Sequence, residues 1–246
     1  MKTSSLILCA FACGAILATA GCKNAPGKPG SEPEIPRPEQ VVDFPTLYAE
    51  NCAACHGVHG QNGAAISLAN PVYIAIAGAA NIQHITAVGV VHTAMPPFAQ
   101  SSGGMLTDQQ IAILAQGIAT TWGKPALFAG VTIPAYASAT SGDATRGQLA
   151  FTNLCARCHG ANATGGKAEN GSITGSLVDP AYLALISDQG LRSIIIAGQP
   201  EQGMPDWRHH LNGTVAHQMT DQEILDVVAW LTSHRIANPG QPYQSH

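Results

Sequence analysis

The chain has 246 residues, a length that fits one or two domains; 46% of them are hydrophobic and only 11% are charged. Its formal net charge is −4 and it has no basic stripe, which excludes a nucleic-acid-binding surface. Three of its seven cysteines lie near the N-terminus, and the other four form two pairs further along the chain.

Residues 1–22 are typical of an export signal rather than of a folded element. A positive residue precedes the apolar run Leu6–Leu17, which is too short to span a bilayer as a mature helix. The run ends in Ala20-Gly21-Cys22, which resembles a bacterial lipoprotein box, so we expect Cys22 to be lipidated. Ordinary cleavage after Ala18-Thr19-Ala20 is the alternative, and either route predicts an exported protein.

Residues 23–43 mix proline, glycine and charges of both signs, a composition that cannot build a core. We expect this stretch to act as a semi-extended tether with a reach of roughly 60 Å when fully extended. Such a tether would let a lipid-anchored domain meet its partners.

Two short motifs carry the chemistry. Cys52-Ala53-Ala54-Cys55-His56-Gly57 and Cys155-Ala156-Arg157-Cys158-His159-Gly160 both follow the pattern Cys-x-x-Cys-His, the attachment signature of c-type haem. The two thiols of each motif can form thioether bonds to one porphyrin, and the histidine then serves as the proximal iron ligand.

A zinc site, a thioredoxin-like redox pair and a plain disulfide are the alternatives for each cysteine pair. The two pairs begin 103 positions apart, which disfavours one shared zinc site, and no strand–helix alternation surrounds them. A disulfide does not explain why histidine follows in the same position twice. Haem attachment is therefore the favoured interpretation.

The second motif belongs to a second copy of a longer repeat. Tyr73 and Met95 are 22 positions apart, and so are Tyr182 and Met204. Further matches keep the same order: Asn70-Pro71 with Asp179-Pro180, Gly89 with Gly198, Met95-Pro96 with Met204-Pro205, and Leu106-Thr107-Asp108-Gln109-Gln110-Ile111 with Met219-Thr220-Asp221-Gln222-Glu223-Ile224.

The repeat predicts helices throughout, and no alternating strand pattern competes. In each copy we expect a helix before the cysteine pair, a short helix with proline in its first turn, and a last helix that begins with a capping box. The last helix of each copy has one apolar face. The expected starts are about Thr46, Asn70 and Thr107 in the first copy and about Asp143, Asp179 and Thr220 in the second.

Each half resembles a class I cytochrome c domain, over residues 44–122 and 142–236. The resemblance rests on the order of first helix, Cys-x-x-Cys-His, methionine before proline, and last helix. It implies an all-α fold of two tandem class I cytochrome c domains, each wrapping one covalently bound haem. A connector at 123–141 would join them, and a C-terminal tail would follow at 237–246.

The resemblance also implies how the first and last helices of each domain cross. In the family, a glycine of the first helix packs near an aromatic residue of the last, and Gly147 and Trp230 fit this pattern in the second domain. In the first domain, Phe44 stands at the glycine position and Gly117 at the aromatic position. We expect this exchange to conserve volume at the crossing.

The same resemblance implies the iron ligands. The proximal ligands would be His56 and His159, and the distal ligands Met95 and Met204, whose soft thioether favours Fe(II). The haem groups would be attached through four cysteines: Cys52, Cys55, Cys155 and Cys158.

Rival ligands are present in both halves. Met105 and Met219 do not share one register. The histidines that could reach an iron are His84 and His92 in the first half and His209, His210 and His217 in the second. None of them is duplicated in register, so we expect surface or supporting roles for them.

Three aromatic residues, Tyr73, Tyr182 and Trp207, are expected to line the haem clefts, either as packing or as donors to propionates. For Arg192, pairing with a propionate and a solvated helix charge both stay open.

The distribution of charge differs between the halves. Residues 44–125 contain only three charged residues, Glu50, Asp108 and Lys124. Because such a surface has few groups that favour water, we expect the first domain to be partly buried against a partner or against the second domain. The connector at 123–141 is too apolar for a free linker and should pack along the domains, fixing the haem–haem geometry.

These features predict an exported, lipid-anchored protein with two covalently bound haem c groups. It would carry single electrons between membrane or periplasmic redox partners, as a subunit or close partner of a respiratory or photosynthetic complex. We expect neither catalysis nor a small-molecule substrate. One alternative is a dihaem peroxidase or sulfur-compound oxidoreductase, which needs an open iron. The other is a structural or docking subunit whose haems only lengthen the electron-transfer path of a larger complex.

Overall fold

The structure is a computed structural model of the chain. It describes residues 35–167, 171, 173–209 and 217–236. The expected signal with Cys22, most of the tether, His210 and the C-terminal tail lie outside the described residues.

The chain divides into two units, Met1–Arg37 and Pro38–His246. Of the first unit only residues 35–37 are described, and they are exposed. The second unit holds every helix and strand described below.

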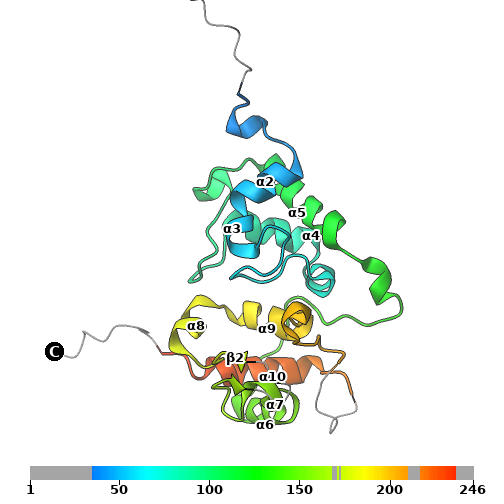
Figure 1. The fold of residues 1–246 in the computed structure, drawn as a ribbon, viewed down its shortest axis with the longest axis vertical. Coiled ribbons are helices and arrows are strands. Elements are labelled where there is room, and N and C mark those ends of the chain that lie inside the picture. Colours follow the sequence, from blue (N-terminus) through cyan, green and yellow to red (C-terminus); the bar gives the residue numbers. More distant parts are fainter. Residues whose placement is uncertain (1–34, 168–170, 172, 210–216, 237–246) are drawn as a thin grey trace, which may run out of the picture. The chain divides into compact units, whose positions relative to one another are not determined.

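Helices dominate the described residues, which confirms the predicted all-α class (Figure 1). The elements that we call the first module are η1 Pro38–Gln40, α2 Phe44–Asn51, α3 Ala53–His56, α4 Pro71–Val88, η2 Gln100–Ser102 and α5 Asp108–Trp122. The connector contains η3 Pro125–Phe128. The second module contains α6 Ala144–Leu154, α7 Ala156–His159, β1 Gly166–Lys167, β2 Ile173–Thr174, α8 Pro180–Leu185, α9 Asp188–Ala197, η4 Pro200–Gln202 and α10 Asp221–Thr232.

Strands β1 and β2 form an antiparallel pair that the sequence did not predict, with Gly166 opposite Thr174. Each strand is only two residues long, so it offers no alternating pattern from which a strand could be recognised.

Polar caps begin the predicted helices. Asp43 caps α2 by accepting a hydrogen bond from the Thr46 backbone nitrogen at 2.9 Å, so this helix begins at Phe44 rather than at Thr46. Both predicted capping boxes are present: Thr107 pairs with Gln110 at the start of α5, and Thr220 pairs with Glu223 at the start of α10.

The short middle helix takes two forms. In the first module, α4 continues past a break at Gly78, whose φ of 67° and ψ of 159° are not helical. In the second module, the chain forms the separate helices α8 and α9, and the Ser187 side chain caps α9 by accepting from the Gly190 nitrogen. A glycine thus interrupts the helix in the first module, and a side-chain cap starts a new helix in the second.

The first and last helices contact each other in both modules, α2 with α5 and α6 with α10. Buried side chains of both modules belong to one continuous apolar cluster, which also includes Phe128 of the connector. Residues Val131, Ile133 and Tyr136 pack against this cluster, so the connector is not a free linker, as expected.

Candidate functional sites

The two Cys-x-x-Cys-His motifs have the same backbone geometry. In each, the first cysteine ends one helix and caps the next, and its carbonyl accepts from the nitrogens of the second cysteine and the histidine. The histidine N···O distances are 3.0 Å for His56 and 3.1 Å for His159. This single turn gathers two thiols and one imidazole within a few residues.

The four thiols of these motifs are free of disulfide bonds. Burial raises the pKa of the Cys52 thiol to about 11 and that of the Cys155 thiol to about 12. Both therefore remain neutral thiols at neutral pH. A pair of unbridged cysteines beside one histidine fits covalent attachment of haem better than a structural disulfide.

His56 has the environment of an iron ligand. Its side chain is buried, and Nδ1 lies 2.8 Å from the Ile66 carbonyl oxygen, so Nδ1–H donates and Nε2 keeps its lone pair. Burial lowers the pKa of His56. A neutral, oriented imidazole with Nε2 available is what the iron of a haem requires, so the residues present fit the group.

His159 differs in one respect. Burial lowers its pKa too, but its buried Nδ1 has no hydrogen-bond partner among the described residues. The carbonyl that matches Ile66 in register belongs to Gly175, and a Cβ built on Gly165 would lie 2.6 Å from its oxygen. The two proximal histidines thus have unequal surroundings.

The methionine loops also repeat in three dimensions. Gly89 and Gly198 end their helices with φ of 71° and 65°, a region that favours glycine. A Cβ on Gly89 would lie 2.7 Å from the Met95 carbonyl oxygen, and one on Gly198 would lie 2.5 Å from that of Pro205. Each glycine therefore lets the methionine–proline segment pass close to the helix end.

Met95 and Met204 are half-buried at the ends of these loops. The rivals have other surroundings: Met105 is 82% exposed, and Met219 packs against the core with its nitrogen bonded to the Trp207 carbonyl.

The rival histidines that the structure describes lie at the surface. His84 and His92 are exposed, and so are His209, which pairs with Asp206, and His217, which pairs with Glu223. These positions agree with the surface roles expected for them.

The expected cleft aromatics differ in burial. Tyr73 is 6% exposed, Trp207 2%, and Tyr182 is half-buried. The guanidinium of Arg208 lies 5.1 Å from the centroid of the Trp207 ring and 5.4 Å from that of Phe128 in the connector. Arg208 thus links the indole to the connector, and a contact of Trp207 with a haem stays a prediction.

Arg192 is not a solvated helix charge, because its side chain is 3% exposed. It donates to the carbonyls of Ala135 and Tyr136 in the connector and pairs with Asp221 at the start of α10. One buried nitrogen, Nη1, has no partner among the described residues, so a propionate contact stays open at that atom.

Sequence reasoning missed Trp122 at the end of α5. Its ring lies 5.1 Å from that of Tyr48 and 5.9 Å from that of Phe44, and the Tyr48 hydroxyl donates to the Gly57 carbonyl at 2.8 Å. Trp122 thus supports the turn that follows His56. No register match pointed to it, because the corresponding residue of the second copy is Arg235.

No helix in the described part of the chain is both long enough and apolar enough to cross a membrane. The same residues hold no cluster of three or more His, Cys, Asp or Glu side chains that could bind a metal ion.

Comparison with known families gives two matches in separate parts of the chain. Residues 144–235 match the cytochrome c family, and residues 40–116 match the family described as cytochrome c oxidase, cbb3-type, subunit III.

One curated relative is the cbb3-type cytochrome c oxidase subunit FixPc of Rhizobium leguminosarum bv. viciae, which is 29% identical over 185 residues. The match covers 71% of this chain and 57% of the relative, so the chain spans a little over half of that protein's length. A solved chain of the reducing HAO-like protein complex of Kuenenia stuttgartiensis is 17% identical, with a TM-score of 0.42 over 83% of this chain and 100% of that one.

Proposed function

The chain belongs to the cytochrome c family as a tandem of two such domains, and from this we propose that it is a two-haem electron carrier. Each module would hold one covalently bound haem c, which supplies a one-electron iron couple when bound. The observation that carries the proposal is that two features recur with the same backbone geometry in both modules. One is the Cys-x-x-Cys-His turn, and the other is the methionine loop that passes close to a glycine at a helix end.

The proposed ligands are His56 with Met95 and His159 with Met204. His56 is buried and His159 is half-buried, and burial lowers the pKa of both. Each methionine is half-buried in a loop that passes close to a glycine at a helix end. A thioether favours Fe(II), so histidine–methionine ligation supports a higher potential than two histidines would. Two closed irons would accept and release electrons without binding a substrate.

We propose a membrane electron-transfer complex of the cbb3-type oxidase class as the partner. The names of the family matched by residues 40–116 and of the relative from Rhizobium support this choice. Export to the periplasmic side and a lipid anchor at Cys22 rest on the sequence pattern of residues 1–22 alone.

The surface of the first module supports a subunit role. Between residues 44 and 125 only three side chains are charged. Several large apolar side chains are exposed there instead: Val58 at 72%, Val91 at 77% and Met105 at 82%. Exposed apolar groups with little charge favour a lasting protein contact over a freely diffusing carrier.

An optical spectrum of the purified protein tests the ligand set. The expected result is two haems per chain, a weak red ferric band from the methionine–iron bond at both, and no change on adding carbon monoxide. Met95→Leu and Met204→Leu should each open one iron to carbon monoxide, while Met105→Leu and Met219→Leu should open neither. Rapid binding of carbon monoxide to the unaltered protein would contradict the proposal of a pure electron carrier and favour a haem enzyme with an open iron.

A further inference from the structure

The two modules meet where one helix begins and another ends. The N-terminus of α4, in the first module, lies against the C-terminus of α9, in the second. The residue at the contact is Asn70, whose side chain is 4% exposed.

Both ends of the Asn70 amide are used. Its oxygen caps α4, accepting from the nitrogens of Val72 at 2.9 Å and Tyr73 at 3.3 Å. Its nitrogen donates across the module boundary to the carbonyls of Ala197 at 3.0 Å and Gly198 at 3.2 Å. One buried side chain thus joins positions 127 and 128 residues apart in the sequence.

The contact satisfies groups that a helix end leaves without partners. The carbonyl of Ala197, the last residue of α9, has no N–H donor inside the helix. Because Ala197 is 2% exposed, water has little access to this carbonyl. The carbonyl end of α9 also faces the amide end of α4, so the two helix dipoles are arranged favourably.

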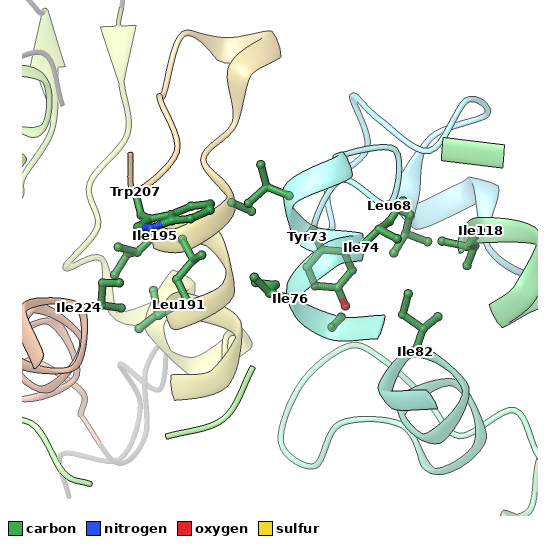
Figure 2. Close-up of a cluster of buried hydrophobic side chains, with 14 of the residues drawn as sticks. Leu68, Tyr73, Ile74, Ile76, Ile82, Ile118, Leu191, Ile195, Trp207 and Ile224 are labelled. Carbon is green, nitrogen blue, oxygen red and sulfur yellow. The ribbon is translucent and has the colours of Figure 1, made fainter. Parts of the chain in front are cut away.

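Apolar side chains also line the boundary between α4 and α9. Figure 2 shows Ile76 of α4 on the side of that helix that faces Leu191 and Ile195 of α9, and all three belong to one buried cluster. Because Asn70 and Ala197 are only 4% and 2% exposed, losing the amide donor would leave buried carbonyls unsatisfied.

Gly198 connects this contact to the second candidate iron site. It receives the Asn70 hydrogen bond through its carbonyl, and its α-carbon faces Pro205, the residue after Met204. A displacement of the first module at Asn70 would therefore displace the Gly198 backbone, which lies beside the methionine loop of the second module.

We propose that Asn70 is the clasp that holds the two haem modules together as one rigid body and so sets a fixed separation between the haems. The proposal rests on the proposed function only in naming haems as the groups that are held; the clasp itself is a property of the protein. It gives a physical reason for the nearly uncharged first module, part of whose surface is covered by the second.

The repeat supplies a matched control. Asp179 stands in register with Asn70 and caps α8 in the same way, accepting from the nitrogens of Ala181 and Tyr182 at 2.9 Å. Asp179 is exposed. The same cap is therefore built with an acidic residue where the side chain is exposed, and with an amide where it must also donate to a second module.

The test compares Asn70→Asp with Asp179→Asn in the complete, haem-loaded protein. The first variant keeps the cap oxygen of α4 but replaces the amide donor with a carboxylate that faces two carbonyl oxygens. The second makes the opposite chemical change at the matched position. The measurement is hydrogen–deuterium exchange of peptides from α4 and α9, which reports the opening of the contact even where the closed form dominates.

The expected result is that exchange in α9 and in the first turns of α4 becomes about 10- to 100-fold faster in Asn70→Asp, the size expected for a lost buried donor. Asp179→Asn should change these rates by less than about twofold. Peptides from α6 and α10 report whether the second module has unfolded as a whole, and they should stay protected.

Asn70→Ser adds a variant that keeps a capping oxygen without a buried charge, and it should accelerate exchange in the same peptides. Unchanged exchange in both Asn70 variants would overturn the clasp. Haem content and the carbon monoxide test are independent of this result, so failure of the clasp and failure of the carrier function are distinguished.

Discussion

The two helix crossings solve one packing problem with opposite residues. In the second module Gly147 of α6 lies against α10, where a Cβ would come within 1.9 Å of the Asp226 carbonyl oxygen and 2.8 Å of the Trp230 Cβ. In the first module Gly117 of α5 lies against Phe44, and a Cβ would come within 2.1 Å of that ring. The glycine and the large residue have changed helices, as the repeat register predicted.

The crossings also differ in what fastens them. In the second module the buried Asp226 carboxylate accepts from the Asp143 nitrogen at 2.7 Å and from two nitrogens of Arg146 at 2.8 and 2.9 Å. In the first, the neutral Gln110 amide donates to the carbonyls of Pro38 and Val41 at 2.8 and 3.0 Å. The two modules thus share a helix crossing but hold it with different polar groups, so we expect only the second crossing to respond to pH.

Removing the large partner should have the largest effect. Phe44→Gly leaves Gly117 facing a cavity, and we expect the free energy of unfolding of the first module to fall by about 3–5 kcal/mol. Calorimetry or denaturant titration measures it. The double variant Phe44→Gly with Gly117→Trp rebuilds the arrangement of the second module and should recover part of the loss. An unchanged melting temperature in Phe44→Gly would refute the packing exchange.

Replacing each glycine with alanine should affect the stability of the two modules differently. Gly147→Ala places Cβ against backbone that cannot move aside, so we expect a loss of about 1–3 kcal/mol. In Gly117→Ala the neighbour is the Phe44 ring, which can turn, and alanine's better helix propensity of about 1 kcal/mol offsets the contact. Equal destabilisation of the two variants, measured by thermal unfolding, would contradict the difference in neighbours.

Acid should weaken the second crossing and not the first. Hydrogen bonds from Arg146 lower the pKa of Asp226, so its contribution to stability is complete above the unfolded-state value of about 3.9 and is lost as the pH falls through the lower folded-state pKa. We expect a loss of roughly 2 kcal/mol. Hydrogen exchange resolved by module measures it. Asp226→Asn should remove this pH dependence. If the variant kept the same pH dependence, other carboxylates would be its cause.

The smallest effect is expected at the neutral fastening. Gln110→Glu keeps the acceptor for the Thr107 nitrogen but loses the donor to Pro38 and Val41. We expect a cost of about 1–2 kcal/mol, because the Gln110 side chain is only 2% exposed although the two carbonyls lie nearer the surface and can bind water. Exchange of the η1 segment measures it. The matched change Glu223→Gln keeps its capping box and should cost less than about 0.5 kcal/mol. A larger loss in Glu223→Gln than in Gln110→Glu would contradict the role given to the Gln110 donor.

Much of the fold was predictable because its signals are local. Asn70, Thr107 and Thr220 cap helices through bonds that span two or three residues, and such bonds can be recognised in sequence. The break at Gly78 and the pair β1–β2 were not predictable, because a single glycine and two-residue strands carry no periodicity. Of the candidate sites, the motif cysteines and histidines and the registered methionines came from the sequence, and their haem ligation awaits the spectrum.

By itself the sequence determined the two haem-attachment motifs, the repeat register and the exchanged glycines, since each depends on residue type at a fixed spacing. Only the tertiary structure decided what the polar side chains reach. Arg192 donates to carbonyls 56 and 57 residues away, and Asn70 to carbonyls 127 and 128 residues away. Spacing does not encode such contacts, because they depend on which buried donor and acceptor the folded core brings together.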